Sequence, residues 1–441
     1  MNALEIFPVE IWEIIINKLD NRELLKLRYV SDDLNKIIER IIIKKKLWEK
    51  LFRVNAIPWI NQIIAKRFPT VKQRQWRSLY QSIWKQLLFS YIKWRFFGNS
   101  HREIIIKSCN ISKQLMKNEK ITCFDVWVSV LAIGTNTGSI YFYNIKEISS
   151  EPFYATNHRE HVTQIKLWYL GFKKLIAVST SVNGKLKFWN IHAKNEILTS
   201  QQYYGKNICV GLNRRLFVEN SFTIKEYSSD SIQITPKAAF EVYEIDQNDP
   251  EFEFLSMYSE KDKLQVLIEY SSAVIILFYK ISQHDPVFPV IADDFYPLRG
   301  RPVRLGPDDV FDFDFDCTFH ISNMTVTIIA HAGFLSVRVE NSNVPSIWKT
   351  HKIPLAENVT VTSTVMFANL LFIGLSTGNI NVYAVGNIAD LLDNNLIFKN
   401  LRTIELDIFP IIALNLTEIK KVPYIIASTE SKLYSVNIIN I

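Results

Sequence analysis

The chain has 441 residues, of which 48% are hydrophobic and 22% charged, a composition typical of globular proteins and unlike that of disordered chains. Its net charge of +7 is uneven, because residues 1–100 hold 19 Lys and Arg against 9 Asp and Glu. The four cysteines are widely spaced and form no CxxC pair, which argues against a disulfide framework or a thiolate zinc site.

The longest apolar runs are far shorter than the roughly 20 residues that a membrane-spanning helix needs. No basic segment followed by a long apolar segment precedes Phe7, so we expect no signal peptide. We therefore predict a cytoplasmic or nuclear location, or both, and no membrane partner. We assign the basic charge near the N-terminus to solvated helix faces, and we predict no nucleic-acid partner.

The segment FPVEIWEIIINKLD (residues 7–20) predicts an apolar helix with Pro8 in its first turn. Its apolar stripe is formed by Ile11, Ile14, Ile15 and Leu19. A D-x-x-E pattern beginning at Asp20 predicts a second short helix, and Ser31 predicts the start of a third. Three helices of this length have little room for a core of their own, so we expect another polypeptide to cover them.

This N-terminal segment resembles an F-box, from FPVEIWEIIINKLDNRELLKLRYVSDDLNKII to the following LWEKLF at residues 47–52. Phe7 replaces the usual Leu, and Leu34 stands where Trp is common. The resemblance implies docking on the Skp-type adaptor of a cullin–RING ubiquitin ligase. The residues it assigns to adaptor binding are Pro8, Ile11, Ile15, Leu19, Leu24, Leu25, Leu27 and Val30. The alternative is a small helical bundle internal to the protein.

Residues 53–100 are basic and aromatic. Aromatic residues interleaved with cations can bind single-stranded nucleic acid. Here, however, they recur every three or four positions, which favours one helical stripe that faces a core. That stripe comprises Trp76, Tyr80, Trp84, Leu87, Leu88 and Tyr91. The segment also resembles, in part, the linker of F-box/WD-repeat proteins.

From residue 121 onward, apolar residues alternate with polar ones, and this pattern predicts β-hairpins. The clearest units are residues 131–145, 176–191 and 371–385, with turns at Gly138, Gly184 and Gly378. Weaker units occupy residues 216–228, 265–281, 326–341 and 424–438. Within the second unit, STSVNGKLKFWNI is similar to the WD-repeat signature, although no unit contains the Trp-Asp pair itself.

We therefore predict an α+β multidomain fold. Its parts are an F-box three-helix unit at 1–52, a helical linker at 53–100 and an all-β, seven-bladed WD-repeat-like β-propeller at 101–441. The segment REIIIKSCNI (102–111) belongs to no repeat. We expect Ile104 to Ile106 to pair with the last unit, so that a strand near 103–111 closes the propeller and protects its edges.

Sequence motifs that could indicate a catalytic or metal-binding site are weak. GLSTG (374–378) matches a nucleophile elbow centred on Ser376, but an alternating strand follows it, so we expect a hairpin turn. The Phe and Asp residues of DDVFDFDFDC (308–317) are expected to form opposite faces of a strand rather than a cation site, and HREH (158–161) lacks metal-site spacing. We predict no enzymatic activity, no catalytic residues, no cofactor and no bound metal.

The loop PLRGRPVRLGP (297–307) lies in the longest interval between units. Its cations, Arg299, Arg301 and Arg304, are candidate substrate-binding residues because guanidinium groups hold phosphate or carboxylate bidentately. A solvated loop is the other interpretation.

Together these features favour the substrate-recognition subunit of an SCF-type (Skp–cullin–F-box) ubiquitin ligase. Its partners would be a Skp-type adaptor, through it a cullin–RING ligase, and a protein substrate bound by the propeller. The alternative is a non-ligase WD-propeller scaffold for the assembly of protein complexes, whose helical N-terminus would be folded by itself.

Overall fold

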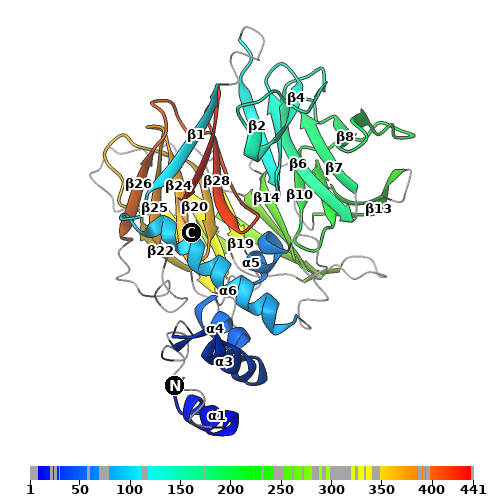
Figure 1. The fold of residues 1–441 in the computed structure, drawn as a ribbon. Coiled ribbons are helices and arrows are strands. Elements are labelled where there is room, and N and C mark those ends of the chain that lie inside the picture. Colours follow the sequence, from blue (N-terminus) through cyan, green and yellow to red (C-terminus); the bar gives the residue numbers. More distant parts are fainter. Residues whose placement is uncertain are drawn as a thin grey trace.

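In the computed structural model, short helices near the N-terminus are followed by a body made of β-sheets (Figure 1). The structure describes residues 8–19, 23, 27–28, 30–56, 60–68, 79–110, 118–171, 174–221, 223–229, 233–242, 252–260, 263–270, 273–280, 288–290, 295–297, 319–322, 326–331, 334–339, 348–385, 390, 393 and 398–438.

Five α-helices lie within these residues. They are α1 (Val9–Asn17), α3 (Asp32–Lys44), α4 (Leu47–Ala56), α5 (Ile60–Arg67) and α6 (Gln81–Arg95), with 3-10 turns at η3 (Phe96–Gly98) and η5 (Ile145–Glu147). Ser31 caps α3 as predicted, because its hydroxyl oxygen accepts the Leu34 N–H at 3.2 Å. None of the helices described is both long and apolar enough to cross a bilayer.

The predicted stripe of the linker is confirmed for its four members within α6. Trp84, Leu87, Leu88 and Tyr91 are all buried on one side of α6. Tyr80, at the N-terminal end of the helix, is exposed, and Trp76 lies outside the described residues. The stripe is therefore a packing surface.

The described strands form seven antiparallel sheets, six of four strands and one of five. The first three sheets in the chain are β2 (Ile121–Trp127), β3 (Val130–Thr135), β4 (Ser139–Asn144) and β5 (Tyr154–Asn157); β6 (Val162–Gly171), β7 (Lys174–Ser181), β8 (Leu186–Asn190) and β9 (Asn195–Glu196); and β10 (Asn207–Val210), β11 (Leu216–Asn220), β12 (Thr223–Ser229) and β13 (Ile234–Glu241).

The next two sheets are β14 (Phe252–Glu260), β15 (Lys263–Tyr270), β16 (Ala273–Lys280) and β17 (Phe288–Val290), with β18 (Phe295–Pro297) also on β16; and β19 (Phe319–Ser322), β20 (Val326–His331), β21 (Phe334–Val339) and β22 (Trp348–Lys352). The last two are β23 (Val361–Phe367), β24 (Leu370–Leu375), β25 (Asn379–Ala384) and β26 (Asn400–Glu405); and β27 (Ala413–Ile419), β28 (Val422–Ser428), β29 (Lys432–Ile438) and β1 (Ile104–Asn110).

The hairpins predicted from alternation are confirmed. The three clearest units are the pairs β3–β4, β7–β8 and β24–β25. Their turns hold Gly138, Gly184 and Gly378 at φ of +91°, +73° and +80°, a left-handed conformation that disfavours a side chain. The four weaker units are likewise antiparallel pairs: β11–β12, β15–β16, β20–β21 and β28–β29.

Strand β1 joins the N-terminal part of the chain to its C-terminal end. It pairs antiparallel with β29, with Ile104 opposite Ile438 and Ile106 opposite Val436. The predicted pairing of Ile104 to Ile106 with the last strands is therefore confirmed. This pairing adds a fourth strand to a sheet that the C-terminal residues alone leave at three.

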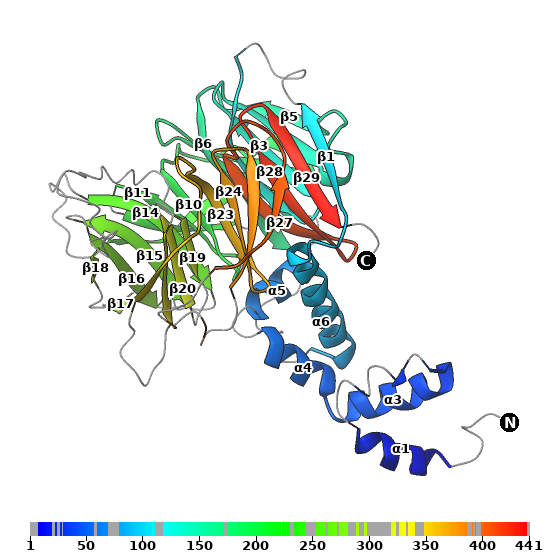
Figure 2. The same ribbon diagram turned by 90° about the vertical axis from the view of Figure 1, so that its left-hand side faces the viewer.

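Apolar cores lie between successive sheets, and the largest core also includes the helices. One core lies between the β2–β5 and β6–β9 sheets, and another between the β6–β9 and β10–β13 sheets. The largest unites buried residues of α1, α3, α4, α5 and α6 with those of the β23–β26 and β27–β29 strands. In Figure 2, α5 and α6 pack beside the sheets, whereas α1 and α3 project away from them.

The fold class predicted from the sequence is wrong. The prediction combined an N-terminal three-helix F-box unit and a helical linker with a single seven-bladed WD-like propeller. The described residues instead form five short α-helices and several separate antiparallel sheets. Alternation specifies which strands pair within a hairpin, but it does not specify how sheets combine. Helical spacing likewise marks a buried face without showing that helices and strands share one core.

The turn of β24–β25 offers a test of the local packing. A Cβ on Gly378 would lie 2.2 Å from the Asp407 carbonyl oxygen, whereas a Cβ on Gly184 would find no atom closer than 3.8 Å. Both glycines have positive φ, so Gly184→Ala isolates the conformational cost, of about 1 kcal/mol. We expect Gly378→Ala to lower the free energy of unfolding by about 1–3 kcal/mol more, because overpacking adds to that cost.

Chemical denaturation of both variants measures the difference. Equal losses for Gly378→Ala and Gly184→Ala would contradict the close approach to Asp407.

Candidate functional site

The residues assigned to adaptor binding do not all share one environment. Ile11 and Ile15 on α1 are 40% and 42% exposed, and Val30 is 67% exposed. Pro8 is exposed just before α1, whereas Leu19 and Leu27 are half-buried against the largest core. Leu24 and Leu25 lie outside the described residues.

Helix α1 is apolar on two faces, and the described residues cover one of them. Ile16 is buried and Trp12 is half-buried against the core, where α1 contacts α3. The uncovered face carries Ile11, Ile14 and Ile15, which are between 40% and 55% exposed. This set, here called the isoleucine face, lies on the part of the chain that projects from the sheets (Figure 2). The structure therefore presents an apolar surface well away from the sheets.

Some of the other predicted motifs lie within the described residues, and some lie outside them. Ser376 lies in the β24–β25 turn, where its hydroxyl oxygen accepts the Thr360 N–H at 3.1 Å, so GLSTG is a hairpin turn as expected. His158 is buried, and burial lowers the pKa of its imidazole. The candidate substrate-binding residues Arg299, Arg301 and Arg304 lie outside the described residues, as does the DDVFDFDFDC segment. No group of three or more His, Cys, Asp or Glu side chains suited to a metal ion occurs in the described part of the chain.

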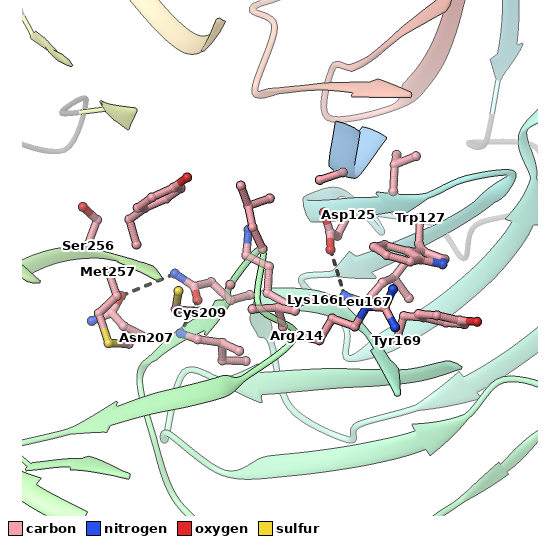
Figure 3. A pocket seen from close by; sticks show the side chains of 18 of the residues that line it. Asp125, Trp127, Lys166, Leu167, Tyr169, Asn207, Cys209, Arg214, Ser256 and Met257 are labelled. Atoms are coloured by element: carbon pink, nitrogen blue, oxygen red, sulfur yellow. Dashed lines mark hydrogen bonds between the residues drawn. The ribbon is translucent and has the colours of Figure 1, made fainter. Parts of the chain in front are cut away.

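One further site was not predicted from the sequence. It is a cavity of about 390 Å³ between α5 and the first strands of four successive sheets, β2, β6, β10 and β14, here called the strand-end pocket. Figure 3 shows Asp125, Lys166, Asn207 and Arg214 around it. Ala65 of α5 and Phe68, just after that helix, form part of its wall.

Asp125 holds neighbouring strands together at this pocket. Its Oδ2 accepts the Leu167 N–H at 2.8 Å, which joins β2 to β6. Its Oδ1 accepts a hydrogen bond from the Asn415 amide of β27 at 2.9 Å. Both carboxylate oxygens are therefore engaged by neutral donors, and the negative charge of Asp125 serves the contact between sheets.

Two cationic side chains line the same pocket. The Arg214 guanidinium lies 4.9 Å from the centre of the Tyr169 ring, which in turn stacks on Trp127 at 5.1 Å. Burial lowers the pKa of Arg214. Lys166 is half-buried on β6, and none of the ion pairs between described residues involves it. The pocket thus combines an aromatic stack with an ammonium group that has no carboxylate partner there.

Two thiols lie close to Lys166, the buried Cys209 and the half-buried Cys123. Burial raises the pKa of both Cys123 and Cys209 to about 12, and the nearby Lys166 charge offsets only a small part of this effect. Cys209 lines the pocket. At neutral pH both groups are therefore protonated thiols, which are poor nucleophiles.

A second cavity, of about 190 Å³, lies where α5 and α6 meet the β27–β28 turn. Glu418 is its centre: the Arg67 Nε lies 3.0 Å from one oxygen, and the Ser90 hydroxyl donates to the other. Burial raises the pKa of the Glu418 carboxyl. The Lys93 ammonium donates to the Lys421 carbonyl oxygen at 3.1 Å. This cluster, the helix–sheet junction, fixes α5 and α6 on the last sheet.

Comparison with protein families gives no match, and comparison with curated proteins gives none either. Among solved structures, the computationally designed Ika8 protein is similar, with a TM-score of 0.44 and 12% identity. The alignment covers 73% of this chain and 97% of that one. A likeness of this size supports no statement about the function of the present chain.

The raised thiol pKa values predict how the cysteines react. At pH 8 only about 10⁻⁴ of a thiol with a pKa near 12 is thiolate, so Cys123 and Cys209 should resist iodoacetamide in the native protein. Their alkylation rate should rise with pH up to about 12 and should increase sharply on denaturation. Mass spectrometry of the peptides measures each site separately. Rapid modification of native Cys209 at pH 8 would show that its thiol is neither buried nor protonated.

Breaking the ion pair of the helix–sheet junction should lower the free energy of unfolding. Glu418→Ala should lower the free energy of unfolding by about 3 kcal/mol, because it leaves the largely buried Arg67 without its carboxylate. The matched control is Glu430→Ala, which removes the exposed Lys120–Glu430 pair and should cost less than about 1 kcal/mol.

A second variant separates charge from packing. In Arg67→Met with Glu418→Leu, apolar groups of similar size replace both charges, and most of the lost stability should return. Denaturation curves compare the three proteins. A double variant as unstable as Glu418→Ala would mean that the charges themselves hold the helices in place.

Proposed function

We propose that this chain is the substrate-recognition subunit of an SCF-type ubiquitin ligase, in which the N-terminal helices dock a Skp-type adaptor and the sheets hold a protein substrate. The observation that carries the proposal is the isoleucine face of α1, which is uncovered and projects from the sheets. The F-box-like order of residues in this segment supports the identity of the partner.

Exposing apolar side chains to water costs free energy that a bound partner can recover. Complete burial of an Ile side chain contributes roughly 1.5–3 kcal/mol, so three partly exposed isoleucines on a nine-residue helix represent free energy that a bound partner can recover. Single exposed apolar residues are normal on protein surfaces, but a contiguous set marks an interaction site. The charged residues of the helix, Glu10 and Glu13, lie to one side of this set.

In this role the protein positions a substrate and does not itself catalyse the transfer of ubiquitin. A substrate held on the sheets and an adaptor held on α1 would be kept at a fixed separation by the shared core between them. Such tethering raises the effective concentration of a substrate lysine near the ubiquitin-loaded enzyme of the ligase. The proposal places the protein in the cytoplasm, the nucleus or both, where cullin–RING ligases work.

Substitution of the isoleucine face tests adaptor docking. Ile11→Asp with Ile15→Asp should reduce recovery of a co-expressed Skp-type adaptor at least tenfold, because it puts two charges into an interface that is apolar in the complex. The melting temperature should stay nearly unchanged, since both side chains are exposed in the free protein.

The matched control is Ile408→Asp, which adds a charge at an isoleucine that is 82% exposed in the turn between β26 and β27. It should leave adaptor recovery unchanged. Equal recovery with the wild type and with the α1 variant would reject the docking proposal.

A further inference from the structure

The strand-end pocket has the size and the mixed lining of a small-molecule site. Its volume of about 390 Å³ falls within the range of roughly 300–1,000 Å³ that is usual for ligand pockets. Apolar side chains from two parts of the fold line it, Phe68 beyond α5 and Met257 on β14. Polar groups of Gln164 and Asn207 stand among them. Such pockets bury an apolar ligand body and fix its orientation through a few polar contacts.

The charges around the pocket do not balance. Asp125 is the acidic residue among those that line it, and its two oxygens accept hydrogen bonds from Leu167 and Asn415. Lys166 and Arg214 are the basic ones. Arg214 is held against the Tyr169 ring, whereas Lys166 lines the pocket with no ion pair or ring contact among the described residues. The lining thus carries one positive charge more than negative.

The polar side chains near Lys166 are already hydrogen-bonded to neighbouring residues. The side-chain oxygen Oε1 of Gln164 accepts the Ile208 N–H at 2.8 Å, and its side-chain Nε2 donates to Oδ1 of Asn207 at 3.4 Å. Asn207 in turn donates to Glu219 at 3.0 Å. These bonds hold β6 and β10, the first strands of neighbouring sheets, next to each other, and none of them involves Lys166. A ligand with an acceptor of negative charge would complete its hydrogen bonding.

We propose that the strand-end pocket binds a small organic anion, with its anionic group on the Lys166 ammonium and its apolar body against Phe68 and Met257. A metal ion does not fit this lining, because two of its three charged groups are cationic. This inference is independent of the proposed ligase function. It concerns the sheets and α5, not the isoleucine face.

The test uses the full chain and two fluorescent probes of similar shape. One is 8-anilinonaphthalene-1-sulfonate, which carries a negative charge, and the other is N-phenyl-1-naphthylamine, which is neutral. Wild-type protein should bind the anionic probe at one site. Lys166→Met, which keeps the length of the side chain without its charge, should weaken that binding at least about tenfold and leave the neutral probe unaffected. Lys166→Arg should restore most of the affinity.

Two further variants fix the location. Ala65→Phe would fill the pocket from α5 and should abolish binding of both probes, whereas Lys107→Met, at an exposed lysine on β1, should change neither. Circular dichroism and melting temperature establish that each variant is folded, and Lys166→Gln serves if Lys166→Met is not. The same affinity of the anionic probe for wild type and for a folded Lys166 variant would overturn the proposal, as would unchanged binding to Ala65→Phe.

Discussion

The packing of Trp94 against the β23–β26 sheet determines where the helices lie. This side chain, near the end of α6, is fully buried and meets Phe367 and Phe372 edge-on at ring-centre distances of 4.9 Å and 6.4 Å. Phe97 of the following turn adds a second edge-on contact with Phe372, at 6.0 Å. Aromatic pairs of this geometry favour a specific arrangement beyond the gain from burial. The helical segment is thus attached to the sheets at its C-terminal end.

This attachment gives α5 a place over the strand-end pocket. Arg67, its last residue, pairs with Glu418 of β27, while Ala65 and Phe68 reach the cavity wall. An ion pair buried this deeply contributes little net stability compared with apolar replacements, but it permits few alternative positions of the helix. The pocket therefore depends on a contact between helices and sheets as well as on the strands that form most of its lining.

The sequence predicted local structure well and the combination of elements poorly. The Gly turns, the Ser31 cap and the pairing of Ile104 to Ile106 follow from residue chemistry over a few positions. The pocket lining comes from segments up to about 190 residues apart, Ala65 to Met257, and no local pattern brings these together. The sequence nevertheless contains an indication of the pocket. Asp125, Lys166 and Asn207 each place a polar group in or beside an apolar first strand, and a polar group in such a place usually has a hydrogen-bonding or binding role.

The two apolar faces of α1 differ in how far the folded chain covers them. A helix that is hydrophobic around most of its circumference is normally buried on all sides. In α1, Ile16 and Trp12 meet the core, and this contact alone accounts for the helix being held against α3. Ile11, Ile14 and Ile15 are each between 40% and 55% exposed, although their side chains are as apolar as those of the core. The proposed adaptor interface would bury these side chains, which the other described residues leave partly exposed.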